Sequence, residues 1–560
     1  MKKTVKLLAL LLALVMVLSV FAGCKKSGGD DDTKAPEQTQ GGEGQTDATE
    51  PEVTNPPVEE GKYGGHLNAR TTGVYVDPIK KANQWSYQQF TLGFENVLLR
   101  NADNEIRPGV CNYVLSEDWL DLKLTVRPGA TFWDGTDVTI ADVKASMERA
   151  MNLGNTYGKI KPFIETMEIE GDTLHITFTE YSTTVWAALA SYKTFCSVMP
   201  AAVCEKWFDD EIGVDDWQDL MGTGPYKMTD FRENEYVTYE RREGYVPVDA
   251  DPANTGHASP KMAYLDSITF WKNTDDASAA VALYSGNYDV TEVITTEDIK
   301  AGLLEANGLV SDPRPSLTGC AMYFNTKGKN NVCAKYKDLR KAIMAAVDYE
   351  EFLTVVTDDQ QVMGGCPFAN PALATDAFVN ADYYGPANVD LAKEYLEKAR
   401  EAGYADEPVQ IVVSLRTDIP TMLQSYLDAA GIPCETQLLE STTLTEFRKD
   451  VDNNFDVWFV WPEYAFQPEE LAIATYDTYW GNERKDELMN ILKTTPTDSD
   501  EYAEAFEELV EIWVDDCSHA YMSKIYWYWF HPSDLVINDE GMLRYWFNTY
   551  WENPADHPRT

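Results

Sequence analysis

The sequence is poor in basic residues: it has 46 Lys and Arg against 92 Asp and Glu, which gives a formal net charge of −46. Nucleic acids are bound through concentrated Lys and Arg side chains that neutralise phosphates. A chain with this balance is therefore not expected to bind nucleic acid. An excess of acidic residues is typical of the solvated surface of a soluble, exported protein.

Histidine and short metal-ligand spacings are also scarce. The six His residues are far apart, and the chain contains neither H-E-x-x-H nor C-x-x-C, so we expect no metal site and no cofactor. G-x-S-x-G and G-x-x-x-x-G-K-[ST] are absent too, which argues against a common hydrolase and against ATP hydrolysis by this chain. A glycosidase carboxylate pair stays open among 92 acidic residues.

A long apolar run occurs near the start of the chain. Lys2, Lys3 and Lys6 precede the run Leu7 to Phe21, an arrangement typical of an export signal and too short for a comfortable membrane span. The segment ending at Cys24 resembles a bacterial lipobox, although Phe21 stands in place of the usual Leu. We therefore expect a signal peptide over residues 1–23 and lipidation of Cys24. An ordinary cleaved signal is the alternative.

The segment after Cys24 has almost no apolar residues. Residues 25–60 are rich in Gly, Pro, Thr, Asp and Glu and cannot bury enough surface to fold. We predict a disordered tether over residues 24–61, with a reach of roughly 30–35 Å. It would hold the folded part at the outer face of the cell membrane.

Eight further cysteines lie between Cys111 and Cys517, with Cys196 and Cys204 the closest pair in sequence. An even number of cysteines outside the cell permits disulfides. Buried free thiols are equally compatible with the spacing. The sequence leaves both alternatives open.

The clearest local pattern is a strand followed by a turn, between Leu120 and Pro128. Leu122, Leu124 and Val126 alternate with polar residues, which is the period of a strand with one buried face. Pro128-Gly129 then suits a type II turn, because Pro presets φ and Gly accepts a positive φ. The pattern predicts a strand that ends in a tight turn.

A helix is predicted after the next turn, at Asp134-Gly135. Thr139 can cap it, and Asp142 three residues later completes a capping box. The helix should begin at about Ile140. Its inward face is predicted to hold Ile140, Val143, Met147 and Met151, with Glu148 and Arg149 outside.

These residues carry a family resemblance. The order of strand, R-P-G-A-x-F, D-G-T and helix resembles the extracellular solute-binding proteins of family 5, the oligopeptide- and dipeptide-binding components of ABC importers. G-T-G-P-Y at Gly222 to Tyr226 resembles a second family motif, and the resemblance extends from about Tyr63 to Trp551. A phosphate-binding loop is rejected here, because Pro225 has no amide donor and no G-K-[ST] follows.

The resemblance implies an α/β, two-lobed periplasmic-binding-protein-like fold of class II (cluster C), with a small domain inserted in the first lobe. Alternation of predicted strands (410–415, 455–460) and helices (390–402, 422–430) favours an α/β second lobe independently. A short strand is predicted at 320–326. The expected boundaries are 62–100, 220–310 and 532–560 for the first lobe, 101–219 for the inserted domain, and 311–531 for the second lobe.

Aromatic residues suggest where a ligand would bind. The chain has 15 Trp and 31 Tyr, densest in 455–464 and 526–530, and such rings suit a cleft around an organic ligand. In peptide-binding relatives, a segment beginning with F-D leads to an Asp that pairs with the ligand's α-ammonium group. Glu463 or Tyr464 takes that place here. The predicted ligand-binding residues are Tyr323, Trp458, Trp461, Glu463, Tyr464, Tyr526 and Trp527.

The resemblance implies a substrate-binding lipoprotein of an ABC importer that captures peptides or a related small solute and performs no bond chemistry. Its implied partners are a permease and an ATPase encoded separately, and we expect a monomer. The alternatives are a secreted carbohydrate-active enzyme, a family member for oligosaccharides or another non-peptide solute, and a surface adhesin. Turnover of a labelled ligand would favour the enzyme, and tight binding to a host or wall polymer would favour the adhesin.

Overall fold

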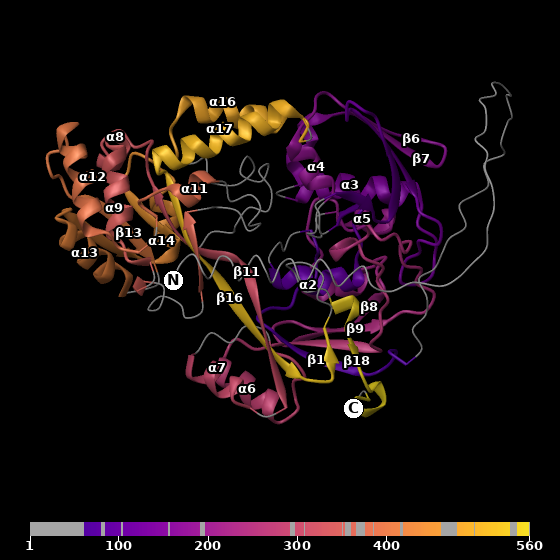
Figure 1. The fold of residues 1–560 in the computed structure, drawn as a ribbon. Helices are drawn as coiled ribbons and strands as arrows, with labels where there is room; N and C mark the ends of the chain where they lie inside the picture. Colours follow the sequence, from indigo (N-terminus) through magenta and orange to yellow (C-terminus); the bar gives the residue numbers. More distant parts are fainter. Residues whose placement is uncertain are drawn as a thin grey trace, which may run out of the picture. The chain divides into compact units, whose positions relative to one another are not determined.

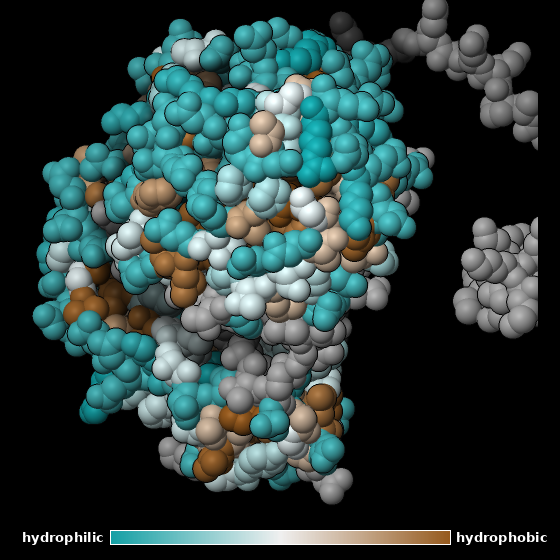
Figure 2. Space-filling view, turned by 90° about the vertical axis from the view of Figure 1, so that its left-hand side faces the viewer, coloured by the Kyte–Doolittle hydropathy of each residue, from teal (hydrophilic) through white to brown (hydrophobic). Residues whose placement is uncertain are grey.

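The computed structural model describes residues 61–79, 84–101, 105–154, 157–190, 196–291, 297–306, 308–349, 351–352, 360–365, 376–384, 386–414, 418–460, 479–497, 499–537 and 546–558. The predicted signal, Cys24 and the predicted tether as far as residue 60 lie outside these ranges. In the described part, no helix is long and apolar enough to cross a membrane. The face shown in Figure 2 is mostly hydrophilic, as the acidic composition leads one to expect.

The first large sheet has the strand order β1-β10-β9-β8. Figure 1 labels three of its strands, β1, β8 and β9. β1 runs parallel to β10, and the other neighbours are antiparallel. The strands are β1 (His66–Thr71), β8 (Tyr226–Arg232), β9 (Tyr236–Arg241) and β10 (Ser267–Lys272), and α2 (Gln84–Gly93) contacts β8. Short elements add to this part of the chain: β2 (Leu98–Arg100), β3 (Ile106–Pro108), β17 (Leu535–Val536), β18 (Tyr550–Trp551) and the 3₁₀ turns Gly256–Ala258, Trp546–Asn548 and Pro554–Asp556.

The predicted loop Gly222 to Tyr226 packs tightly in front of β8. Gly224 donates its backbone N–H to the Gly93 carbonyl at 2.9 Å. A Cβ on Gly222 would lie 2.1 Å from that same oxygen, so a larger residue does not fit. Because these glycines have no side chain, the loop backbone can lie directly against Gly93 at the end of α2.

A separate antiparallel sheet of order β4-β5-β7-β6 is formed by strands that lie between β1 and β8 in the sequence. Its strands are β4 (Cys111–Leu115), β5 (Asp121–Val126), β6 (Ile164–Glu170) and β7 (Thr173–Phe178). It is accompanied by α3 (Ile140–Leu153), α4 (Thr183–Leu189), α5 (Ala201–Lys206) and the 3₁₀ turns Tyr157–Phe163 and Val214–Asp219. Its apolar residues share one hydrophobic core with the first sheet, which we call the first core.

The strand, turn and helix predicted from the sequence are confirmed. β5 has the predicted alternation, Gly129 has a φ of +78°, and α3 begins at Ile140. The Thr139 side chain accepts from the backbone N–H of Asp142, whose carboxylate accepts from the backbone N–H of Thr139. Both halves of the capping box are thus present.

The predicted outward position of Arg149 is wrong, because its side chain is fully buried. It pairs with Asp77, with Nη2 2.5 Å from Oδ2, and it donates to the backbone carbonyls of Trp207 at 2.7 Å and Asp210 at 3.2 Å. These partners satisfy the guanidinium, which is the condition for burying a charge. Val143 and Met147 are buried as predicted, whereas Ile140 and Met151 are only partly buried.

The second large sheet has the order β12-β16-β11-β15-β13-β14. β13 runs parallel to both β14 and β15, and β11 and β16 form an antiparallel pair. The strands are β11 (Leu309–Phe324), β12 (Gln360–Gly365), β13 (Val409–Ser414), β14 (Cys434–Leu439), β15 (Val457–Val460) and β16 (His519–Pro532). The predicted strands at 410–415 and 455–460 correspond to β13 and β15. The strand predicted at 320–326 is only the last part of the much longer β11.

Helices surround this second sheet. They are α8 (Val332–Lys335), α9 (Lys337–Ala346), α11 (Asp376–Asn380), α12 (Val389–Glu401), α13 (Asp418–Ala430), α14 (Ser441–Phe447), α16 (Glu483–Thr494) and α17 (Asp500–Asp516). The predicted helices at 390–402 and 422–430 correspond to α12 and α13. Two buried clusters fill the space between these helices and the sheet, and we call them together the second core.

β11 and β16 run together over most of their length, as Figure 1 shows, and their ends belong to different cores. Trp529 near the end of β16 packs in the first core, whereas Ala520 and Met522 pack in the second. The helices α6 (Asp276–Tyr284) and α7 (Glu297–Leu304) pack beside Phe530 in a small cluster of their own. The strand pair therefore joins the two cores.

The seven described cysteines are free thiols, and six of them are buried. Burial raises the pKa of the Cys196 thiol to about 12. For these seven residues, including Cys196 and Cys204, the free-thiol alternative holds. Cys366 lies outside the described residues.

We expect His175 on β7 to titrate above its usual pKa of 6.5, because the Asp121 carboxylate lies 2.9 Å from Nε2 and favours the imidazolium. A folded-state pKa raised in this way stabilises the fold below pH 6.5, and the contribution is lost as pH rises through the folded pKa. An NMR titration of the His175 ring should show the raised pKa. Asp121→Asn should lower it, while Asp172→Asn should leave it in place. An equal pKa in all three proteins would contradict this assignment.

Candidate ligand-binding site

Tyr323 and Trp458, two of the predicted ligand-binding residues, are direct neighbours in the structure. They face each other across the antiparallel pair β11–β15, and their rings meet edge to face at 5.4 Å. Tyr323 is 2% exposed and Trp458 is 8% exposed. Both rings are thus packed inside the second core, where they fix the end of β15.

Polar and charged groups hold this aromatic pair in place. The Tyr323 hydroxyl lies 2.7 Å from the Tyr521 hydroxyl, and the Arg448 guanidinium lies 3.7 Å from the centre of the Trp458 ring. Arg448 also donates to the Tyr479 hydroxyl at 3.1 Å. A cation over an indole face and a hydroxyl pair restrict the rotamers of the rings.

The other predicted residues are described less completely. Trp461, Glu463 and Tyr464 lie outside the described residues. Tyr526 and Trp527 belong to β16, where they pair with Pro315 and Arg314, but their side chains are outside the described part. All five stay predictions.

A cavity of about 590 Å³, which the sequence did not predict, lies among aromatic and charged side chains. This volume is within the range of pockets that enclose a small organic ligand. We call it the Trp119 cavity; Arg100, Arg107, Tyr113, Trp119, Trp186 and Thr497 are among the residues that line it.

One wall of the Trp119 cavity is an aromatic cluster. The Trp119 ring meets Trp186 edge to face at 5.0 Å and Tyr181 at 5.8 Å. Trp119 has a φ of +63°, which is uncommon for a bulky residue, and its backbone N–H closes a turn by donating to the Ser116 carbonyl at 3.0 Å. The indole is only partly buried, so part of its surface is available to a ligand.

Charged groups complete the cavity. Arg107 pairs with Asp251 and donates to Asn254 Oδ1 at 2.7 Å, while Arg100 donates to the Ala190 carbonyl at 2.6 Å. The Glu105 carboxylate accepts from the Asn101 amide at 2.8 Å. Aromatic surface beside fixed charges of both signs suits an amphipathic solute.

Thr497 brings the second core to this cavity. It follows α16, whose apolar residues belong to the second core, and α16 contacts α4 of the first core. The lining therefore includes one exposed residue that follows a helix of the second core, beside residues from the part of the chain around the first core. Local periodicity does not reveal such a site, because its members are far apart in sequence.

No group of His, Cys, Asp and Glu in the described ranges is arranged to hold a metal ion.

Comparison with known families places most of the chain in one of them. The family described as bacterial extracellular solute-binding proteins, family 5 Middle, matches residues 105–484. This range includes the Trp119 cavity apart from Arg100 and Thr497, and most of the second sheet.

Curated relatives share a smaller part of the sequence. The glutathione-binding protein GsiB of Salmonella typhi is 27% identical over 338 residues, which are 59% of this chain and 58% of that protein. GsiB of Escherichia coli O157:H7 is 29% identical over 337 residues, with the same coverage. The chain thus spans less than two thirds of the length of these relatives.

Solved structures share the fold over nearly the whole chain. The ABC transporter substrate-binding protein CtaP of Listeria monocytogenes has a TM-score of 0.71 at 18% identity, covering 88% of this chain and 100% of that one. The oligopeptide-binding protein AppA of Bacillus subtilis, in complex with a nonapeptide, has a TM-score of 0.65 at 17% identity with the same coverage. The fold is that of the two-lobed α/β binding proteins.

Proposed function

Since the chain belongs to the bacterial extracellular solute-binding proteins of family 5, we propose that it is the substrate-binding component of an ABC importer. It captures a peptide or a related small solute and delivers it unaltered to a permease. The family match over residues 105–484 is the observation that carries this proposal.

The two cores and the strand pair between them supply a mechanism. The first lobe comprises residues 62–100, 220–310 and 532–560 with the inserted domain 101–219, and the second lobe comprises 311–531. A ligand that contacts both lobes favours a closed arrangement over an open one, whereas a ligand that contacts one lobe shifts nothing. The Trp119 cavity supports this mechanism, because its lining includes Thr497 as well as residues of the inserted domain.

The Trp119 cavity is one candidate part of the ligand site, and the predicted residues after β15 are another. The cavity supplies aromatic surface, and Glu463 or Tyr464 takes the place that pairs with an α-ammonium group in peptide-binding relatives. Peptides are favoured over other solutes because the relatives include glutathione-binding and oligopeptide-binding proteins. An oligosaccharide or another solute is the alternative within the same family.

The N-terminal segment determines where this happens. Cleavage after residue 23 and lipidation of Cys24 would anchor a monomer at the outer face of the cell membrane, with residues 24–61 as the tether. The permease and the ATPase would be separate chains, and the absence of G-x-x-x-x-G-K-[ST] from this sequence is consistent with a separate ATPase.

Mass spectrometry of molecules that co-purify with the protein tests the proposal directly. We expect a small solute, released intact on denaturation and retained in a 1:1 ratio on rebinding. Thermal-shift screens of peptides, including glutathione, and of oligosaccharides then define the class. Steady formation of a product from any bound solute would contradict a binding protein and would favour the carbohydrate-active enzyme.

Trp119→Ala is expected to weaken binding of the identified solute by about 2 kcal/mol, roughly thirtyfold, because an aromatic wall is lost from the cavity. Calorimetric titration measures the change. Trp217→Ala is the matched control, since Trp217 packs against the first core but does not line the cavity. Equal weakening by both variants would mean that the loss is not local.

A further inference from the structure

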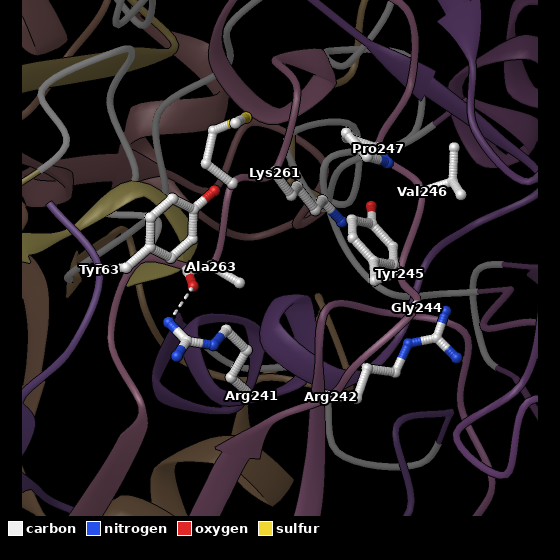
Figure 3. Close-up of a pocket in the computed structure, with 10 residues that line it drawn as sticks. Tyr63, Arg241, Arg242, Gly244, Tyr245, Val246, Pro247, Lys261 and Ala263 are labelled. Atoms are coloured by element: carbon white, nitrogen blue, oxygen red, sulfur yellow. Dashed lines mark hydrogen bonds between the residues drawn. The ribbon is translucent and has the colours of Figure 1, made fainter. Parts of the chain in front are cut away.

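A second cavity, of about 290 Å³, lies in the first core among basic and aromatic residues. Figure 3 shows Tyr63, Arg241, Arg242, Tyr245 and Lys261 around it. We call it the Lys261 pocket. It shares no lining residue with the Trp119 cavity.

Lys261 is the unusual member of this pocket. Its side chain is 2% exposed and points toward Tyr245 (Figure 3). Its ammonium group has no hydrogen-bond partner among the described residues, although it lies 5.3 Å from the centre of the Phe547 ring. An ammonium group has three donors, and a buried cation without acceptors is strongly unfavourable.

The charges around Lys261 do not balance. Arg127 and Arg242 are buried nearby, and Glu95 is the buried carboxylate whose charge acts on all three cations. The Glu95 carboxylate already accepts from the Tyr245 hydroxyl at 2.8 Å and from Arg127 Nη2 at 3.4 Å. Among the described residues, three buried cations thus share one buried carboxylate, in a chain whose net charge is −46.

The guanidinium of Arg242 is only partly satisfied. Its Nη2 donates to Thr131 Oγ1 and to the Thr223 carbonyl, both at 3.2 Å, while Nε has no partner in the described part of the chain. Asp134, whose charge also acts on Arg242, is exposed to solvent. His257 beside Lys261 adds no further positive charge, because burial and the Lys261 ammonium lower its pKa well below 6.5, and a neutral imidazole does not balance the cations either.

We propose that the Lys261 pocket binds a small oxyanion, inorganic phosphate or a carboxylate, which accepts from the Lys261 ammonium and the Arg242 Nε–H. The anion supplies both the missing acceptors and the missing negative charge. The volume of about 290 Å³ is at the lower end of ligand pockets and suits such a small group. This site is independent of the proposed transport function.

Titration of the full chain with sodium phosphate and, separately, sodium acetate tests the proposal, with sodium chloride at equal ionic strength as the reference. We expect phosphate, acetate or both to raise Tm by ~2 °C or more, because an anion bound only to the folded state stabilises it. Lys261→Met should bind the active anion at least about tenfold more weakly in calorimetry. Lys123→Met, which removes an exposed lysine, should bind it as tightly as the natural chain does.

The two anions separate the two sources: a response to phosphate alone assigns the site to phosphate, and a response to acetate alone assigns it to a carboxylate. No response to either anion would overturn the proposal, and so would equal responses of the natural chain and Lys261→Met. If Lys261→Met does not fold, crystals of the natural chain grown with selenate test whether an anion binds beside Lys261. An anomalous selenium peak beside Lys261 Nζ supports the site, and its absence at saturating selenate overturns it.

Discussion

Replacing Arg149 by Met is expected to lower the free energy of unfolding by about 3–5 kcal/mol, because it leaves the buried Asp77 carboxylate without its cation. Asp77 is 3% exposed, so water cannot take the place of the guanidinium. The substitution also removes donors from the carbonyls of Trp207 and Asp210, which tie α3 to the segment after α5. Urea unfolding followed by tryptophan fluorescence measures the change.

Arg232→Met is the matched control for this prediction. Arg232 pairs with Glu235 at 3.6 Å, and both side chains are more than half exposed, so the same substitution should change stability by no more than ~1 kcal/mol. The double variant Arg149→Met, Asp77→Asn should recover part of the loss, since the uncompensated carboxylate is then gone. Similar losses of stability in Arg149→Met and Arg232→Met would show that the buried ion pair contributes no more to the free energy of unfolding than the exposed pair does.

Arg149 also shows how far local sequence patterns reach. The start of α3 could be predicted, because Thr139 and Asp142 form a capping box within four residues. The burial of Arg149 could not, because its partner Asp77 lies 72 residues earlier in the chain. A helical period assigns a charged residue to the outer face unless a distant residue supplies the opposite charge.

The second sheet shows the same contrast between elements that local patterns predict and contacts that join residues distant in sequence. β13, β15 and the helix α12 follow from alternating and helical apolar periods. The long pairing of β11 with β16 joins residues about two hundred positions apart, such as Tyr323 and His519, and no local period encodes that register. For the same reason, only the last part of β11 was predicted as a strand.

The candidate site was predictable only in part. Tyr323 and Trp458 were predicted together as ligand-binding residues, and the structure places them side by side and buried, so their contact with a ligand stays a prediction. The Trp119 cavity was missed, because Trp119, Tyr181 and Trp186 each look like ordinary core aromatics in sequence. Their gathering depends on the folding of β4–β7 and α4, and the strained φ of Trp119 is visible only in three dimensions.

Glu463→Gln is expected to weaken binding of a peptide with a free α-amino group by about 2–5 kcal/mol, provided that the Glu463 carboxylate pairs with the ligand's ammonium group. The substitution keeps the size of the side chain and removes its charge, so a loss reports the charge itself. An N-acetylated form of the same peptide has no ammonium group, and its affinity should be equal for the natural chain and for Glu463→Gln. Calorimetry with both peptides therefore forms a thermodynamic cycle between the carboxylate and the amine.

Glu504→Gln provides the control for a general effect of negative charge, because Glu504 is exposed on α17. It should leave the affinity for the free-amine peptide within about twofold, since exposed charges are screened by salt. If Tyr464 takes the anchoring place instead, Glu463→Gln will have no effect and Tyr464→Phe will weaken binding. If neither substitution changes the preference for the free amine, the ligand's ammonium group is bound elsewhere. The two predicted anchor residues then have no role in peptide selection, and the Trp119 cavity with its Glu105 carboxylate becomes the site to test.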